Sequence, residues 1–477
     1  MVSIPGDADN KVGGAASKGN NHHHHHHKRR ELDTAFARIA VPAFVQFSAE
    51  PIARLVDTAY LGRLGAASLG GAGAAIATTY ALSKLSNDPL LRTSISFVAA
   101  AGDDQDTAST SAALALAIAV GLAQMTIVLC LAPVILTRVA LVGPDSVMRG
   151  PALSYLCVAA LGAPTASLWL VANGIFRGLG DTTSPLAASL LFCGLNAVLD
   201  PIFIFPLGMG AAGAAMGTAV AQTIALYPLL KRLAVKQRKP SVISLLTASS
   251  KDRVFAALGQ YLSAGAFVVL RSLGKIAAYS ICAREASRLG AVSAAAHNLC
   301  FQLGVATTQL CESAAVATQS LCARERKDRA ATVHVFKRGL FVGLGASLLL
   351  SSVSYANRVS VVGGLTTDAA VRAAALAIFP LVMACQVLKG LAYPINGALM
   401  GFLDWKAASA TMWLAQFACA TTLYATRDQP PTLARLWVSL AALFSVQCVA
   451  GLARIASNTG PWQGFFLAPS SNSSAIF

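Results

Sequence analysis

Residues 109–137 read STSAALALAIAVGLAQMTIVLCLAPVILT and contain no Asp, Glu, Lys or Arg. About 20 consecutive apolar residues suffice for a helix to cross the roughly 30 Å hydrocarbon core of a bilayer, so this stretch predicts a transmembrane helix. The whole chain has the same character, because 55% of its 477 residues are hydrophobic, 12% are charged and the mean hydropathy is +0.60. This composition excludes a cytosolic enzyme and indicates a membrane protein that crosses the bilayer many times.

Similar apolar stretches recur along the chain. Those without any charge lie at 150–176, 201–230, 289–311, 339–357, 407–426 and 436–453. Those with isolated charges lie at about 35–62, 64–98, 182–206, 254–281, 312–323 and 368–400, of which 312–323 continues the helix that begins at 289. At about 35 residues per crossing with its loop, the apolar part of the chain accommodates about twelve crossings. We therefore expect an all-α polytopic membrane protein with about twelve transmembrane helices.

Two motifs recur at nearly the same offset. The sequence RLGAAS at 63–68 recurs as RLGAVS at 288–293, and the pattern NGxxxGxxD at 173–181 recurs at 396–404. Because six crossings is an even number, both halves begin on the same side of the membrane and form a parallel repeat. We expect two six-helix lobes that enclose a cavity, an architecture typical of alternating-access transporters.

The composition also suggests how the chain is divided. We expect a disordered polar tail at 1–30, an N-lobe with six helices at 31–235, a basic linker at 236–253, a C-lobe with six helices at 254–455 and a tail at 456–477. The run of six histidines at 22–27 fits an expression tag or a low-complexity tail better than a metal tract.

The net charge of +16 comes from basic clusters between the apolar stretches. By the positive-inside rule these clusters mark the inner side, which also holds the N-terminus, and nucleic-acid binding is not expected. The ten cysteines are scattered without a C-x-x-C motif, so neither a zinc site nor a disulfide framework is predicted. We expect a monomer in the lipid bilayer, with a small organic molecule as its partner and no metal or other cofactor.

Isolated carboxylates inside apolar spans are expensive and usually functional. Glu50, Arg54 and Asp57 share one helical face, and Glu50 and Arg54 can neutralise each other, which leaves Asp57 as the candidate for binding a proton or cation. A purely structural ion pair among the three is the alternative. Asn196 and Asp200, four residues apart, and Thr218 in the next span would add hard oxygen ligands suited to H⁺ or Na⁺.

Other candidates lie in the first helix and in the second half. Pro42 removes a backbone hydrogen bond and permits either a movable bend or a static kink. Arg271 and Lys275, four residues apart in the seventh span, would attract an anionic substrate. Glu312 in the eighth span is the other C-lobe candidate, and a structural ion pair with Arg271 or Lys275 is the alternative for it.

Residues 50–65, EPIARLVDTAYLGRLG, resemble the first helix of multidrug and toxic compound extrusion (MATE) transporters, specifically the DinF-like branch that includes the plant DETOXIFICATION proteins. The segments at 83–91, 174–182 and 196–205 are similar to the same family, and the resemblance covers about 35–455. It implies twelve helices in two lobes and cation-driven export of organic compounds.

The resemblance also assigns roles to individual residues. It implies an N-lobe cation site at Asp57, Asn196, Asp200 and Thr218, with Pro42 as the bending proline. The chain departs from the family pattern at Arg54, where a small or apolar residue is usual. It departs again at Cys311-Glu312-Ser313, where plant relatives tend to carry Asp-Ala or Asp-Gly.

We therefore expect an antiporter, coupled to H⁺ or Na⁺, that exports xenobiotics or organic anions across the plasma membrane or an organellar membrane such as that of a plastid. A lipid or lipid-linked sugar flippase is the alternative within transporters, and Arg271 and Lys275 favour it. An integral-membrane enzyme finds no support, because the spans carry no catalytic triad, His-rich metal motif or phosphate-binding glycine loop.

Overall fold

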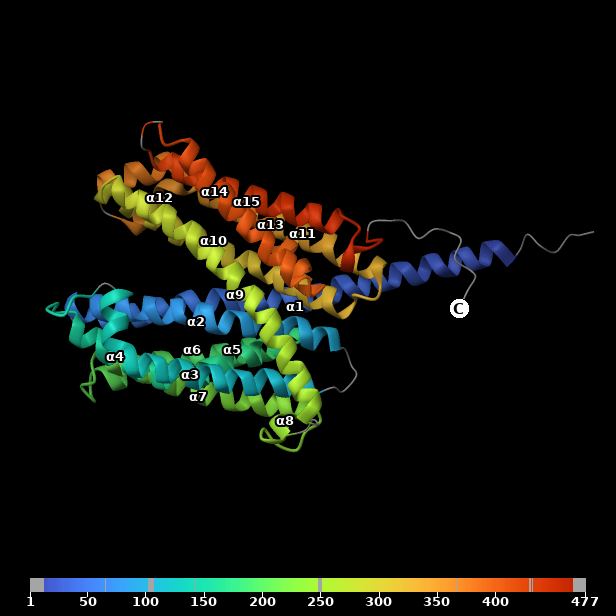
Figure 1. Cartoon of the computed structure of the whole chain (residues 1–477), viewed down its shortest axis with the longest axis horizontal. Coiled ribbons are helices and arrows are strands. Elements are labelled where there is room, and N and C mark those ends of the chain that lie inside the picture. The colour runs from blue at the N-terminus through green and yellow to red at the C-terminus, as the bar shows by residue number, and fades with distance from the viewer. Residues whose placement is uncertain are drawn as a thin grey trace, which may run out of the picture.

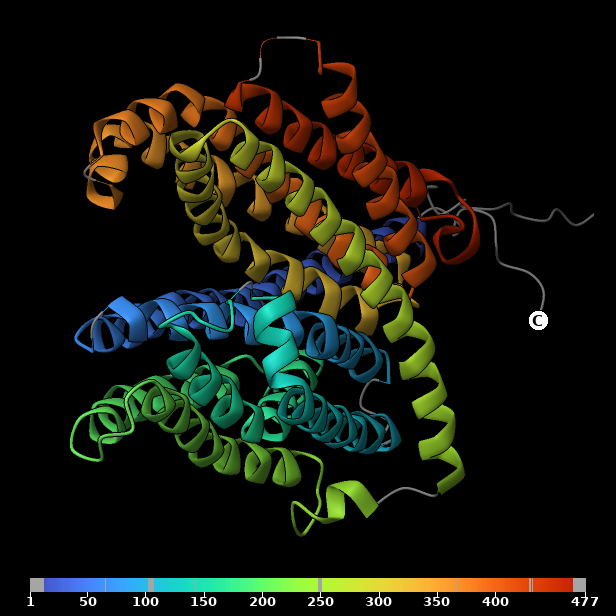
Figure 2. The same cartoon turned by 60° about the vertical axis from the view of Figure 1, so that its left-hand side comes forward.

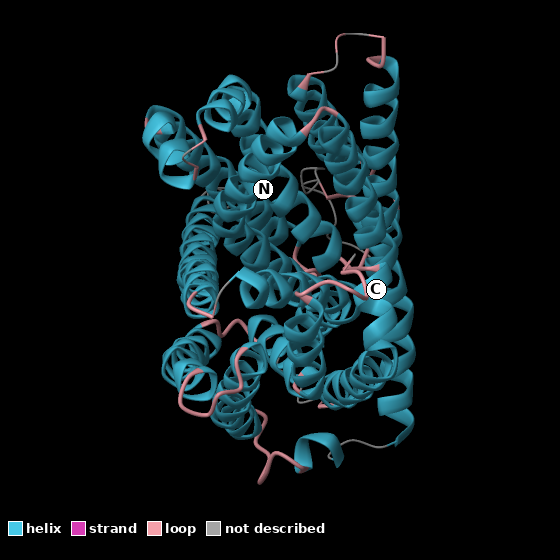
Figure 3. Ribbon diagram, turned by 90° about the vertical axis from the view of Figure 1, so that its left-hand side faces the viewer, coloured by secondary structure: helices cyan, strands magenta, loops and turns pink. Residues whose placement is uncertain are grey.

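The described part of the chain is helical throughout, with no strand (Figure 3). The computed structural model describes residues 13–64, 66–101, 107–140, 142–247, 251–366, 368–428, 430 and 432–465. Helices are the expected outcome for these apolar stretches, because a backbone inside a bilayer must satisfy its hydrogen bonds within the segment.

The N-terminal half contains six crossings. Its helices are α1 (Gly13–Gly62), α2 (Ala66–Ala101), α3 (Ala108–Arg138), α4 (Arg149–Leu161), α5 (Ala163–Gly178), α6 (Thr183–Ile204) and α7 (Ala211–Lys236). The pair α4 and α5 forms a single crossing that is bent by 55°. A short helix, α8 (Ser244–Thr247), lies in the segment between α7 and the second half, where the basic linker is predicted.

The C-terminal half repeats this pattern. Its helices are α9 (Lys251–Arg288), α10 (Ala291–Arg324), α11 (Arg329–Ala356), α12 (Arg358–Leu365), α13 (Ala369–Gly401), α14 (Trp405–Ala425), α15 (Leu433–Ala456) and the 3₁₀ turn η1 (Gly460–Trp462). Within the described residues, seven helices are long and apolar enough to span a membrane alone, and α4–α5 adds an eighth. With the more polar long helices α1, α2, α10 and α14, the expected twelve helices are confirmed.

The two halves form two lobes that meet at one end and diverge at the other (Figure 1). They meet at the inner end, where Phe36 and Ile39 of α1 share an apolar core with Leu321 of α10. Helix α9 runs along both lobes (Figure 2). Its early residue Tyr261 belongs to the N-lobe core, whereas its later residue Cys282 belongs to the C-lobe core. The middle of α9 therefore lies at the boundary between the lobes.

The repeated glycines bring helices into close contact. A Cβ atom at Gly174 or Gly178 of α5 would lie 2.7 or 2.8 Å from a backbone oxygen of α2. At Gly397 and Gly401 of α13 the corresponding distances to backbone oxygens of α10 are 2.6 and 2.7 Å. The repeat thus encodes the same close helix packing in each lobe, as small residues commonly do in membranes.

The repeated aspartates fasten the last helix of each lobe. Asp181 accepts a hydrogen bond of 2.9 Å from Lys236, and Asp404 accepts one of 2.7 Å from Arg454. Burial raises the pKa of Asp181, but hydrogen bonds from Ser184 and Lys236 outweigh this effect and hold the pKa below its usual value. The ion pair therefore persists down to acidic pH on the inner side.

The expectation of a disordered tail at 1–30 is wrong from Gly13 onward, where α1 is already helical; residues 1–12 lie outside the described part. The first proline after Gly13 is Pro42, and adding turns to an existing helix avoids the cost of nucleation. Contacts with α11 also hold this extension, because Lys28 pairs with Asp328 and Asp33 lies 3.0 Å from His334.

The twelve-crossing count predicts the side of each loop. Reporters fused at Lys239 and Arg326 should both read as inside, and a reporter at Arg427 should read as outside, because an even number of crossings separates the first two sites. Accessibility of single introduced cysteines to a membrane-impermeant thiol reagent measures this. If Lys239 and Arg326 were found on opposite sides of the membrane, the count of twelve crossings would be wrong.

Candidate functional site

Four side chains from three helices of the N-lobe come together. Asn196 of α6 donates hydrogen bonds to Asp200 Oδ1 at 2.8 Å and to Thr218 Oγ1 of α7 at 3.2 Å. The carboxyl group of Asp57 of α1 lies close enough to that of Asp200 for the two to interact electrostatically. Asp200 is fully buried, and Asn196 is 1% exposed. The structure therefore brings together the four residues that the sequence pointed to.

Glycines allow α7 to approach these carboxyl groups. A Cβ atom at Gly213 would lie 2.7 Å from the backbone of Phe203, and one at Gly217 would overlap Oδ1 of Asp200. Sequence reasoning missed both glycines, since many glycines occur in the apolar spans and only the packing distinguishes them. They place Thr218 within reach of the amide of Asn196.

Two carboxyl groups this close in a low-dielectric lobe repel each other when both are ionised, so the pair favours a shared proton or a bound cation in its place. The Asp57–Asp200 pair offers carboxylate oxygens, with amide and hydroxyl oxygens beside them at Asn196 and Thr218. These are ligands for H⁺ or Na⁺. The arrangement can thus take up and release one positive charge inside a low-dielectric lobe.

The other first-helix candidates are placed only in part. Pro42 lies within α1, one turn before Gln46, whereas the side chains of Glu50 and Arg54 lie outside the described residues. Gln46 is a buried residue that sequence reasoning missed. It donates hydrogen bonds to Asn173 at 2.7 Å and to Ser189 at 2.9 Å, so it fastens α1 to α5 and α6 beside the proline.

A second group of charges lies between the lobes. Arg92 of α2 contacts Asp88 at 2.9 Å on its own helix and Glu312 of α10 at 2.9 Å. Lys84 lies 3.7 Å from Asp88. The alternative that Glu312 pairs with Arg271 or Lys275 is therefore wrong, because packing of α2 against α10 places Arg92 nearer.

Arg271 and Lys275 of α9 add positive charge to this group. Arg271 is 6% exposed, its Nε is buried, and no ion pair or hydrogen bond reaches its side chain within the described residues. Electrostatic interactions link Arg271 to Arg92, Asp88 and Glu312. We call this set the interlobe cluster: Lys84, Asp88, Arg92, Arg271, Lys275 and Glu312. By formal charge, its four basic residues exceed its two carboxylates by two.

A pocket follows directly along α9 and α10. It has a volume of about 620 Å³, and Tyr279, one turn after Lys275, forms part of its wall with Phe301 at a ring distance of 5.0 Å. Asn298 and Gln302 are among the residues that add polar side chains to the lining. The pocket can therefore bind an organic group next to the excess positive charge.

Gly217→Ala tests the packing around Asp200. The added methyl group overlaps the carboxyl group, so we expect gradient-driven transport to fall at least tenfold and the stability to fall by about 1–3 kcal/mol. Transport in proteoliposomes and thermal unfolding measure the two effects. Gly194→Ala on α6 is the control, because a Cβ there meets nothing within 4 Å. Equal transport by both variants would contradict the role of this close packing.

Comparison with known proteins identifies the family. The MatE family model matches residues 42–202 and 268–419. Protein DETOXIFICATION 44, chloroplastic, from Arabidopsis thaliana is 33% identical over 452 residues, which cover 90% of this chain and 84% of the relative. Protein DETOXIFICATION 43 from the same plant is 30% identical over 500 residues, with 92% and 93% covered.

Solved structures agree in fold. A MOP superfamily transporter from Pyrococcus furiosus has a TM-score of 0.80 at 20% identity, covering 89% of this chain and 96% of that protein. A MATE crystal structure in the bent conformation has a TM-score of 0.79 at 20% identity and covers 90% of this chain and 97% of that one. The chain is thus a membrane transporter, not an enzyme, and belongs to the plant DETOXIFICATION-like branch of the MATE family.

Proposed function

We propose that this protein is a secondary antiporter that exchanges H⁺ or Na⁺ for an organic anion and exports the anion by alternating access. The observation that supports this proposal is that the acidic candidate site and the basic candidate site lie in different parts of the protein. The N-lobe holds the carboxyl pair Asp57 and Asp200, and the interlobe cluster holds an excess of two positive charges. Cation and substrate thus have separate sites in one monomer.

The carboxyl pair supplies the energy coupling. Loss of its proton or cation leaves two negative charges in a low-dielectric lobe, and their repulsion separates α1 from α6. Shifting a two-state equilibrium takes a few kcal/mol of differential binding, which an uncompensated buried charge can provide. Pro42 and the Gln46 hydrogen bonds lie on the same helix as Asp57, so α1 is the element that moves.

The interlobe cluster supplies the substrate site. Arg92 connects the lobes through Glu312, and Arg271 lies buried beside this pair without a bonded partner among the described residues. A substrate carboxylate would bind Arg271 and compete with Glu312 for Arg92, which weakens the bond between the lobes. Binding of the anion would then favour the change of access that exports it.

The site chemistry leaves a second candidate, because a cationic cluster between two lobes also suits the phosphate of a lipid or lipid-linked sugar. The open pocket lined by Tyr279 and Phe301 favours a small organic anion over a double-chained lipid. Since two Arabidopsis relatives are described as chloroplastic, we propose a plastid membrane as the site of action.

Counterflow into proteoliposomes tests the function. The purified protein is reconstituted with an internal di- or tricarboxylate, and uptake of the same labelled compound is measured under an imposed pH or Na⁺ gradient. A lipophilic cationic dye and a fluorescent lipid are the competing substrates. We expect carboxylate uptake that follows one of the gradients; movement of the dye or the lipid alone would reject the anion antiporter.

A further inference from the structure

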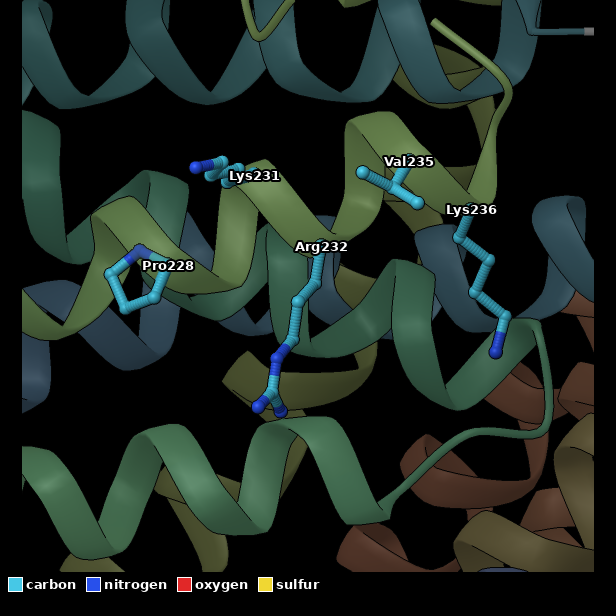
Figure 4. Close-up of a pocket in the computed structure, with 5 residues that line it drawn as sticks. All are labelled: Pro228, Lys231, Arg232, Val235 and Lys236. Carbon is cyan, nitrogen blue, oxygen red and sulfur yellow. The ribbon is translucent and has the colours of Figure 1, made fainter.

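A surface pocket lies on the last turns of α7, ten or more residues beyond Thr218 of the cation site. It has a volume of about 540 Å³ and is lined by Pro228, Lys231, Arg232, Val235 and Lys236 (Figure 4). Lys236 ends the helix, and the positive-inside rule puts this end on the inner side of the membrane. The pocket therefore lies at the inner membrane surface.

The helix presents this pocket to the bilayer. Leu229 and Leu233 are buried at 1% and 0% exposure, so the neighbouring Lys231 and Arg232 point outward. Tyr227 and Val235 are 65% and 71% exposed on the same outer side. An exposed tyrosine and apolar side chains next to cations are typical of the level at which acyl chains meet headgroups.

Lys231 and Arg232 differ from Lys236, the other cation of the pocket, in that the described part of the fold does not pair them. Lys236 is bound by Asp181, and its C-lobe counterpart Arg454 is bound by Asp404 in the same way. Five and four residues before Arg454, however, the chain has Val449 and Ala450 in place of the two cations. Neither Lys231 nor Arg232 has an ion pair in the part of the chain that the structure describes. Two positive charges thus lie free beside a pocket in one lobe only.

We propose that this pocket binds the phosphate headgroup of an anionic phospholipid of the inner leaflet. Arg232 extends away from α7 on the same side as Lys236 (Figure 4), and a guanidinium binds phosphate oxygens through two parallel hydrogen bonds. From Pro228 to Lys236 the helix rises about 12 Å, which spans the distance from acyl chain to headgroup. The apolar wall favours a lipid over free phosphate, and basic pockets on the inner side commonly bind such headgroups.

Native mass spectrometry of the full-length protein tests the site. The protein in neutral detergent is titrated with dioleoyl phosphatidylglycerol, with dioleoyl phosphatidylcholine as the uncharged-headgroup comparison. The test variant is Lys231→Gln/Arg232→Gln. The matched control is Lys251→Gln/Arg253→Gln, which removes two exposed cations at the inner end of α9. Thermal unfolding checks that each variant is folded, and Arg232→Lys keeps the charge while removing the paired hydrogen bonds.

We expect the test variant to bind the first phosphatidylglycerol about thirtyfold more weakly, the control within twofold of the parent, and Arg232→Lys in between. Phosphatidylcholine binding should not change, and millimolar inorganic phosphate should not displace the lipid. If both double variants lost the same affinity for phosphatidylglycerol, the loss would reflect the general surface charge of the protein and not this pocket. Displacement by inorganic phosphate would show a free-anion site, and either result would overturn the proposal.

Discussion

Asp57→Asn and Asp200→Asn should each reduce gradient-driven export by reconstituted protein to the level of protein-free liposomes. An amide keeps the size and much of the hydrogen bonding of the carboxyl group, but it neither releases a proton nor offers a negative charge to Na⁺. Because the two carboxyl groups act as one pair, either change disables the site. Uptake driven by an imposed pH or Na⁺ gradient measures the loss.

The matched control is Asp428→Asn, whose side chain is 88% exposed outside the membrane. It removes the same charge and should transport like the parent. Thermal unfolding should show that all three variants are folded, since asparagine has nearly the size of aspartate and leaves no cavity. Undiminished gradient-driven transport by both membrane variants would reject the cation site.

Arg271→Gln should weaken transport of a di- or tricarboxylate about ten- to hundredfold. A charge-assisted hydrogen bond contributes roughly 1.5–3 kcal/mol, and each 1.4 kcal/mol corresponds to tenfold in affinity. The guanidinium is the better target than Lys275, because it is more deeply buried and a lysine can extend its ammonium group toward water. The concentration dependence of counterflow gives the change in apparent affinity.

Two variants separate substrate binding from a general charge effect. Arg288→Gln removes a cation that is 65% exposed at the outer end of the same helix, and it should leave transport unchanged. Arg271→Lys keeps the charge and should retain part of the anion affinity. If Arg271→Gln moves carboxylates like the parent, Arg271 is a structural residue of the interlobe cluster and the anion hypothesis fails.

The sequence predicts those features of this protein that depend on residues close together in the chain or on a repeated motif. Twelve apolar spans and a parallel repeat define the two-lobed fold, and a spacing of four residues places Asn196 and Asp200 on one face of α6. The partner of Glu312 could not be predicted, because Arg92 is 220 residues away and only the packing of the lobes decides their contact. Gln46 and Gly217 could not be predicted for a related reason: only their buried contacts in the folded protein distinguish them from other glutamines and glycines.

The length of α1 has a mechanical consequence. Fifty residues at 1.5 Å each make a rod of about 75 Å, more than twice the roughly 30 Å apolar thickness of a bilayer. Asp57 lies near one end of this rod, and the other end protrudes past both lobes on the opposite side (Figure 1). By geometry, a rigid tilt of this rod by a few degrees about the carboxyl pair would displace the protruding tip by several ångströms, and the contacts of Lys28 and Asp33 with α11 would pass that displacement to the C-lobe. A small change at the buried carboxyl pair would thus produce a larger movement of the N-terminal end of α1 on the inner side of the membrane.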